Sequence, residues 1–203
     1  MVQRILPVTT CYVGTQDAKK GFAFAKRAFD IVGSLVMIVA LLPLLLVLAA
    51  ISAVDTKGCP LFAQTRMGRN NQPFKMLKFR TMNVNAPANV ATHKLRDAAR
   101  YISPVGEVLR KFSLDELPQL FNILKGDMSF VGPRPVVLSE KDLISLRVRN
   151  GACPVRPGLT GWSQIHGRDR LPIRQKAELD GYYAQNQSME LEFSILLMPD
   201  QFI

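Results

Sequence analysis

The longest apolar stretch of the chain covers residues 31–54, which are 24 residues without a single charged side chain. A helix needs about 20 such residues to cross the hydrocarbon core of a bilayer, so this pattern predicts a membrane-embedded helix. Pro43 divides the stretch into 12 residues before it and 11 after it. At about 1.5 Å per residue, each arm reaches about 16–18 Å, roughly half of the bilayer. Proline also removes a backbone donor and kinks a helix.

Positive charge lies on both sides of this stretch, and positive charge marks the cytoplasmic side of a membrane segment. The basic residues before it are Lys19, Lys20, Lys26 and Arg27, and those after it are Lys57, Arg66, Arg69, Lys75, Lys78 and Arg80. Two half-depth arms with both ends in the cytoplasm predict a re-entrant helical hairpin. A kinked helix that spans the bilayer is the alternative, and charge alone does not separate the two.

The remaining pattern mixes the two hydrophobic periods of strands and helices. Residues 61–67 and 74–82 alternate as strands around a turn at 68–73, which predicts a β-hairpin. Helices are predicted at 16–24, 92–101, 113–124 (ending at Gly126), 139–150 and 171–186. Residues 132–135 read as a proline-stiffened loop, and residues 155–168 as loop-rich. The predicted fold class is α+β: a membrane hairpin, then a small, mostly helical domain that contains the β-hairpin.

The amino-acid composition and net charge limit the kinds of molecule that the protein can be expected to bind. The 203 residues carry a formal net charge of +10, and 48% of them are hydrophobic. The apolar content excludes a disordered chain, while the basicity indicates an acidic partner such as nucleic acid, anionic lipid or a phosphorylated substrate. The sequence contains no glycine-rich RNA motif, no helix-turn-helix spacing and no series of stacking aromatic residues, so we expect no nucleic-acid partner.

The most pointed chemical feature is the adjacent pair Asp115 and Glu116 in the segment 113–118, SLDELP. Two carboxylates are suited to hold a divalent cation, or one of them can act as a nucleophile. The alternative is structural. Ser113 and Glu116 have the spacing of a capping box, and acidic residues stabilise the first turn of a helix.

Several basic side chains could bind phosphate groups. Arg110 lies five residues before Asp115, Arg134 is held between two prolines, and Arg156 and Arg168 border a loop with glycines and Trp162. A planar guanidinium matches phosphate oxygens, and carboxylates with Mg²⁺ and arginines are the groups that phosphoryl transfer requires. For each single arginine the alternative is a solvated surface charge. Lys78 and Arg80 share one face of the second predicted strand. We expect them to bind lipid head groups or a polyprenyl phosphate. The alternative is that they lie on a strand face that is exposed to solvent and binds nothing.

These motifs resemble those of the bacterial sugar transferases, the small monotopic phosphoglycosyltransferases. The resemblance extends from about Lys26 to the C-terminus, and its most specific block is LRKFSLDELPQLFNILKGDMSFVGPRP at 109–135. Other matching segments are KRAFDIVGS (26–34), the apolar run with Pro43, LFAQTRMGRNNQPFKMLKFRTM (61–82), RPGLTGWSQIHGR (156–168) and LDGYYAQNQSMELEFSILL (179–197). One departure is Leu42, because the family often has serine before the proline.

The resemblance implies transfer of a sugar 1-phosphate from a UDP-sugar to undecaprenyl phosphate, with UMP released, as the first membrane step of polysaccharide or glycoconjugate synthesis. It implies that Asp115 is the nucleophile and that Glu116 supports Mg²⁺ binding or proton handling. Arg110 and Arg134 would hold phosphates, and Arg168 would contact the nucleotide.

The resemblance also implies the domain organisation and the location. Residues 1–25 would form an extension, 26–57 the re-entrant membrane helix and 58–203 a catalytic domain on the cytoplasmic face of the bacterial inner membrane. Two alternatives stay open. One is a direct displacement without a covalent intermediate, and the other is a non-catalytic, membrane-anchored scaffold that binds anionic lipid or nucleic acid.

Overall fold

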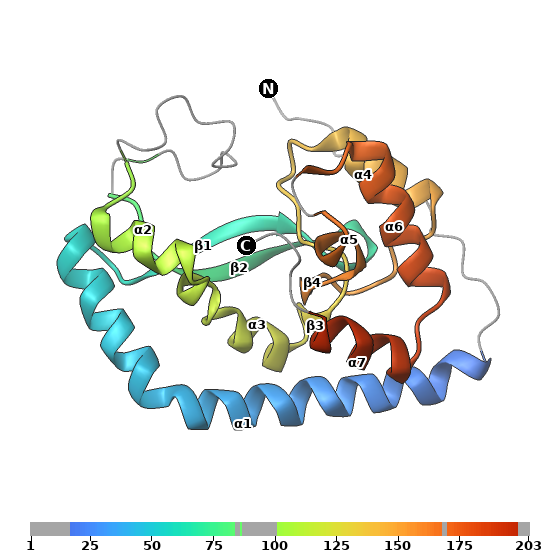
Figure 1. The fold of residues 1–203 in the computed structure, drawn as a ribbon, viewed down its shortest axis with the longest axis horizontal. Helices are drawn as coiled ribbons and strands as arrows, with labels where there is room; N and C mark the ends of the chain where they lie inside the picture. Colours follow the sequence, from blue (N-terminus) through green and yellow to red (C-terminus); the bar gives the residue numbers. More distant parts are fainter. Residues whose placement is uncertain (1–16, 84–85, 87–100, 168–169, 199–203) are drawn as a thin grey trace. The chain divides into compact units, whose positions relative to one another are not determined.

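A computed structural model describes residues 17–83, 86, 101–167 and 170–198 (Figure 1). The helix predicted at 92–101 lies outside these residues except for Tyr101. The chain forms two compact units. Unit 1 consists of residues 1–27, 67–72 and 129–203, and unit 2 of residues 28–66 and 73–128. The structure does not determine the position of one unit relative to the other, so each is considered by itself. The mixture of helices and short strands agrees with the predicted α+β class.

The predicted membrane segment is helical, as helix α1 (Asp17–Thr56). Pro43 lies inside it, and Figure 1 shows α1 as one helix that bends in its light-blue part. Proline explains a bend of this kind, because it has no N–H to donate and its ring clashes with the carbonyl group of Val39. The helix is long and apolar enough to cross a membrane, and only 17% of its most apolar window is buried.

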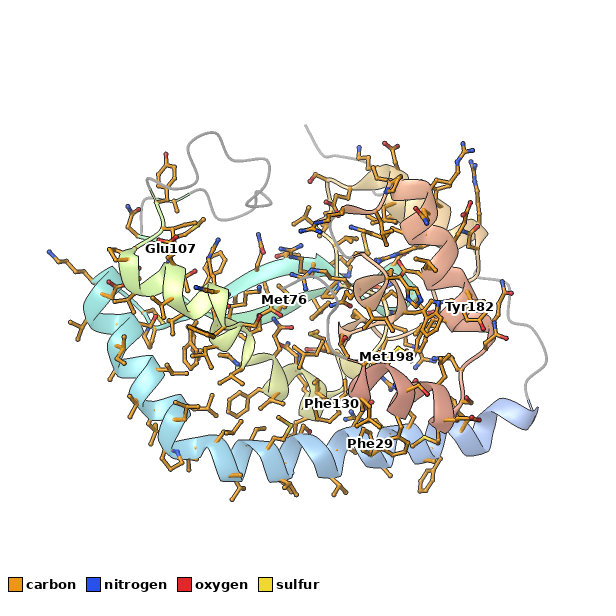
Figure 2. The ribbon with its side chains drawn as sticks, viewed as in Figure 1. Phe29, Met76, Glu107, Phe130, Tyr182 and Met198 are labelled. Atoms are coloured by element: carbon orange, nitrogen blue, oxygen red, sulfur yellow. The ribbon has the colours of Figure 1, made fainter. Side chains whose placement is uncertain are left out.

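The exposed side chains of α1 are of the kind that lipid would cover. Val32, Leu46 and Val54 are 59%, 63% and 79% exposed, and Figure 2 shows many side chains of this helix standing out from it. A large exposed apolar surface marks a protein–protein or membrane interaction site. The structure therefore supports a membrane-anchoring helix. The re-entrant course of this helix stays a prediction.

The predicted β-hairpin is confirmed by strands β1 (Leu61–Met67) and β2 (Pro73–Phe79), which form a two-stranded sheet. The connecting turn contains a short 3-10 helix, η1 (Arg69–Asn71), in which Asn70 and Asn71 have positive φ angles. Strand β2 ends three residues earlier than predicted. Beyond its end, Met82 makes an isolated antiparallel bridge with Ile102.

The core of unit 2 joins the second arm of α1 to this sheet. Leu45 and Leu48 pack with Phe79 of β2 and Leu109 of helix α2 (Pro104–Lys111). Helix α2 was not predicted, although its N-terminus has a clear signal: Ser103 accepts a hydrogen bond from the Gly106 N–H at 2.9 Å, and proline follows it.

The single helix predicted over 113–124 is wrong. The chain forms instead a 3-10 helix, η4 (Leu114–Glu116), and then helix α3 (Gln119–Lys125). Ser113 has a left-handed conformation with φ 55°, which no continuous helix permits. Pro118 has no N–H for the carbonyl of Leu114, and this carbonyl accepts a hydrogen bond from Leu117 at 3.3 Å instead. The predicted end at Gly126 is confirmed by its φ of 102°.

Unit 1 is built around a small parallel sheet of β3 (Ser129–Val131) and β4 (Gly158–Thr160). The predicted helices at 139–150 and 171–186 are confirmed as α4 (Lys141–Arg149) and α6 (Ile173–Gln185), which pack against each other. Helix α5 (Trp162–Ile165) and strand β4 occupy the segment predicted to be loop-rich. Helix α7 (Met189–Leu197) was not predicted.

Glycines let the loop after β3 lie directly against β4. A Cβ atom on Gly132 would lie 2.2 Å from the carbonyl oxygen of Arg156, and one on Gly158 would lie 2.1 Å from the nitrogen of Gly132. Atoms other than hydrogen cannot approach so closely without a bond. Both positions therefore require glycine, and this close packing fixes where the loop 132–135 begins.

Candidate active site

Asp115 lies on the short helix η4 and is 5% exposed, although it is a carboxylate. The capping-box alternative is wrong, because Ser113 makes no side-chain capping hydrogen bond and its left-handed backbone is not that of an N-cap. The hydrogen bond from the Glu116 N–H to the Ser113 carbonyl, 3.1 Å, closes the turn. The turn thus holds the two adjacent carboxylates without using them as caps.

The ammonium group of Lys78, on β2, lies near both carboxylates. Its Nζ lies 2.7 Å from Oε1 of Glu116 and 3.8 Å from Oδ2 of Asp115. The side chains of Lys78 and Glu116 are 19% and 13% exposed, so a ligand has access to this group. Lys78, predicted only as a lipid- or phosphate-binding residue, is therefore part of the same cluster as Asp115.

Asn122 of α3 fixes β2 beside this cluster. Its Oδ1 accepts a hydrogen bond from the Leu77 N–H at 2.9 Å, and its Nδ2 donates to the Lys75 carbonyl at 2.7 Å. Asn122 is 3% exposed. Because its amide bonds one backbone N–H and one backbone carbonyl of β2, it satisfies groups that a neighbouring strand would otherwise pair. No role was predicted for Asn122 from the sequence. The available signal was an amide side chain within an otherwise apolar helical segment.

Arg110 of α2 supplies the second positive charge. Its Nε donates to the Thr81 hydroxyl at 2.8 Å, and Thr81 is 4% exposed. Burial lowers the pKa of Arg110, and the charges of Asp115 and Glu116 act in the opposite direction. Arg110 is therefore held close enough to both carboxylates to interact with them electrostatically.

The pKa of Asp115 is raised above its ordinary value, chiefly by burial and also by the charge of Glu116, while Lys78, Arg110 and a backbone hydrogen bond lower it in part. Burial removes solvating water from the carboxylate. A carboxylate with little hydration, held near two cations, is suited to attack an electrophilic phosphorus atom.

Two carboxylates are also the donor set that fits Mg²⁺. This ion prefers oxygen ligands and usually takes one or two carboxylates together with water and substrate phosphates. The described residues contain no group of three or more His, Cys, Asp or Glu side chains arranged to hold a metal ion. Asp115 and Glu116 therefore fit a magnesium ion shared with a phosphorylated substrate, rather than a closed protein site.

The remaining predicted site residues are Arg80, Arg134 and Arg168. The Nε of Arg80 donates to the Cys59 carbonyl at 2.9 Å, and the guanidinium lies 5.5 Å from the centre of the Phe62 ring. Arg134 belongs to unit 1, in the loop after β3. Arg168 lies outside the described residues.

A buried polar network, which was not predicted from the sequence, supports the Arg134 loop. The Nη1 of Arg147 donates to the Arg134 carbonyl at 3.0 Å, and Arg147 pairs with Asp180 through Nε at 2.8 Å and Nη2 at 2.7 Å. The second oxygen of Asp180 accepts from the Ser163 hydroxyl at 2.7 Å. Asp180 and Ser163 are each 1% exposed, so this network fixes the backbone that carries Arg134.

Comparison with known proteins gives one family. Residues 21–200 match the family described as bacterial sugar transferase. The chain is 40% identical over 187 residues to the exopolysaccharide production protein ExoY of Sinorhizobium fredii, which covers 85% of this chain and 82% of that protein.

Two further relatives are named for reactions on undecaprenyl phosphate. One is the UDP-N-acetylgalactosamine-undecaprenyl-phosphate N-acetylgalactosaminephosphotransferase of Aeromonas hydrophila, 38% identical over 183 residues. The other is the UDP-glucose:undecaprenyl-phosphate glucose-1-phosphate transferase of Caulobacter vibrioides, 37% identical over 179 residues. The matches cover 86% and 85% of this chain, but 42% of the first relative and 67% of the second. The chain thus spans less than half of the longer Aeromonas protein.

Proposed function

Since the chain belongs to the bacterial sugar transferases, we propose that it transfers a sugar 1-phosphate from a UDP-sugar to undecaprenyl phosphate through a covalent intermediate on Asp115. The observation that carries this proposal is the buried Asp115 carboxylate, whose pKa burial raises and which lies 3.8 Å from the ammonium group of Lys78. The products are undecaprenyl diphosphate-sugar and UMP.

The first half-reaction uses Asp115 as the nucleophile. An oxygen of its carboxylate forms a bond to the β-phosphorus of the UDP-sugar, and the bond from this phosphorus to the bridging oxygen breaks. UMP leaves with that oxygen and with the electron pair of the broken bond. Lys78 and Arg110 provide positive charge beside the carboxylates, where negative charge gathers when the diphosphate arrives.

The second half-reaction regenerates the enzyme. A phosphate oxygen of undecaprenyl phosphate attacks the same phosphorus, and the bond to the Asp115 carboxylate breaks. Mg²⁺, held by Asp115 and Glu116, would supply charge neutralisation for the phosphate groups in both halves. Arg134 is assigned to a substrate phosphate and Arg168 to the nucleotide. Arg80 and the exposed side of Lys78 are assigned to lipid phosphate.

The membrane arrangement is part of the proposal. Helix α1 would enter the cytoplasmic leaflet of the bacterial inner membrane, bend at Pro43 and return, with residues 58–203 on the cytoplasmic face. Its support is the exposed apolar surface on both arms and the proline within the bending helix. This arrangement presents the lipid phosphate and the soluble donor to one site.

The intact mass of the protein tests the proposal directly. The purified chain is incubated with a panel of UDP-sugars and Mg²⁺ in the absence of lipid acceptor. We expect a gain equal to one phosphosugar with the correct donor, and no gain for Asp115→Asn. The matched control is Asp127→Asn, which removes a carboxylate paired with Lys125 in the same unit and should keep the adduct.

The outcomes separate the alternatives. If no donor gives an adduct but undecaprenyl phosphate releases UMP, the reaction is a direct displacement and the covalent step is wrong. If neither an adduct nor UMP appears with folded protein, the non-catalytic scaffold is the better account. An adduct that survives in Asp115→Asn would assign the nucleophile to another residue.

A further inference from the structure

Unit 1 contains a cationic pocket of about 420 Å³. None of Lys78, Arg110, Asp115 and Glu116 lines it. Its wall carries four basic side chains, from Lys26, Arg69, Arg149 and Arg156, and the described residues that line it include no aspartate or glutamate. Ligand pockets commonly have volumes of about 300–1,000 Å³, so this one is large enough for a small organic molecule.

The charge of Lys26 is already compensated. Lys26 is buried, forms an ion pair with Glu192 and donates a hydrogen bond to the Val131 carbonyl at 3.0 Å. The Tyr183 hydroxyl lies within hydrogen-bonding distance of both of these acceptors, so it belongs to the same buried network. Lys26 therefore contributes its aliphatic stem to the pocket, and the positive charge comes from the three arginines.

Arg69 is oriented by one hydrogen bond and keeps the rest of its guanidinium available. Its Nε donates to the Pro154 carbonyl at 2.8 Å, and its Nη groups have no hydrogen-bond partner among the described residues. The side chain of Arg149, in the last turn of α4, forms no hydrogen bond or ion pair within the described part of the chain and is exposed. Two guanidinium groups from segments 80 residues apart in sequence thus line one pocket, and of their donors only the Arg69 Nε has a hydrogen-bond partner among the described residues.

The rest of the lining suits the uncharged part of a ligand. Phe22, Pro154 and Val155 provide apolar surface, and the amides of Asn150, Gln185 and Gln187 provide donors and acceptors. Guanidinium groups bind phosphate oxygens with paired N–H donors, and clustered guanidinium charges repel one another unless an anion neutralises them. The combination fits a phosphate group joined to an organic part.

We propose that this pocket binds an anion with at least one phosphate group, held by Arg69 and Arg149 with the support of Arg156. The phosphate group belongs either to a soluble phosphate ester or diphosphate or to the head group of an anionic phospholipid, since the recognition chemistry is the same. The site does not depend on the transfer reaction, and its test needs no activity.

The first experiment is site-resolved. The full chain, in neutral detergent without any UDP-sugar, is treated with phenylglyoxal, which modifies arginine, and the modified peptides are quantified by mass spectrometry. The probes are inorganic pyrophosphate, UMP, and nanodiscs with phosphatidylglycerol or with phosphatidylcholine alone. We expect protection of Arg69 and Arg149 by at least one phosphate probe, and no protection of Arg174, an exposed arginine of α6 outside the pocket.

The second experiment measures the affinity of the protecting probe for Arg69→Gln, Arg149→Gln and the control Arg174→Gln. Loss of a charge-assisted hydrogen bond should weaken binding by about tenfold or more for each pocket variant and should leave the control unchanged. Protection by pyrophosphate or UMP assigns a soluble ligand, and protection only by phosphatidylglycerol nanodiscs assigns a lipid head group.

Three results would overturn the proposal. The first is that no probe protects Arg69 or Arg149. The second is equal protection of Arg174, which would indicate general attraction to a basic chain. The third is unchanged affinity in the double variant Arg69→Gln/Arg149→Gln. Failure of the proposed transfer reaction would leave all three readouts as they are, so the two proposals stand or fall separately.

Discussion

The ion pair between Arg147 and Asp180 offers the sharpest energetic test of the structure. Both side chains are buried, at 9% and 1% exposure. Asp180 accepts one hydrogen bond from Arg147 and one from Ser163, and its Oδ2 also forms an ion pair with the Arg147 Nη2 at 2.7 Å. Removing one member of a buried pair leaves an uncompensated charge and costs about 3–5 kcal/mol. In a chain of this size, 1 kcal/mol shifts the unfolding temperature by about 2–4 °C. Arg147→Met and Asp180→Leu should each lower Tm by about 6–20 °C.

The double variant Arg147→Met/Asp180→Leu distinguishes a coupled pair from two separate contributions. It leaves no buried charge from this pair, so its remaining cost is that of the hydrogen bonds lost by the Ser163 hydroxyl and the Arg134 carbonyl, about 1–3 kcal/mol each. Thermal unfolding in detergent should therefore show a smaller loss than the sum of the two single variants. Ser163→Ala, which removes one hydrogen bond to the same carboxylate, is the control and should cost less than either single variant. A double variant whose loss equals the sum would refute the coupling.

Three further perturbations follow from the site and from α1. Because burial raises the pKa of Asp115, its ionised form destabilises the folded state as pH rises through that pKa. Asp115→Asn should therefore unfold at a higher temperature than the native chain at neutral pH, and the difference should vanish on acidification; a constant difference would contradict the assignment. Asn122→Ala should cost about 1–3 kcal/mol for each of the two backbone groups of β2 that it leaves unpaired, with a smaller loss for Asn122→Asp, which keeps one acceptor. Pro43→Ala should straighten α1. In intact cells an impermeant thiol reagent should then reach only one of Cys59 and the cysteine of Gly21→Cys, whereas with Pro43 present it should reach neither. Labelling of either position with Pro43 present would argue against the re-entrant course.

Local signals predicted the elements that depend on local chemistry. The β-hairpin, α4, α6 and the end of α3 at Gly126 follow from alternation, helical periodicity and a glycine that accepts positive φ. The failure at residues 113–124 has a local cause as well. The helical pattern outweighed Pro118, which lies too deep for a helix that starts at Ser113.

The geometry of the site depended on contacts that no local pattern contains. Asp115 and Glu116 were recognisable as an adjacent pair, and Arg110 lies five residues before Asp115. Lys78, however, is 38 residues from Glu116 and meets it only because β2 packs against η4. The role of Asn122 is hidden for the same reason, since its partners lie 45 and 47 residues away. The roles of Lys78 and Asn122 depend on contacts between segments far apart in sequence. Hydrophobic periodicity could not predict them, because it indicates only which face of a helix or strand is apolar.

The charge balance of the cluster bears on what the proposed reaction requires. Asp115 and Glu116 carry two negative charges when ionised, and Lys78 and Arg110 carry two positive ones, so the cluster is neutral without substrate. A diphosphate that enters it adds negative charge beside a carboxylate whose burial already disfavours ionisation. Attack by Asp115 therefore needs further positive charge at that moment. Mg²⁺ on the two carboxylates is the source that the proposal assigns, and its removal should act on the first half-reaction, before any lipid acceptor is present.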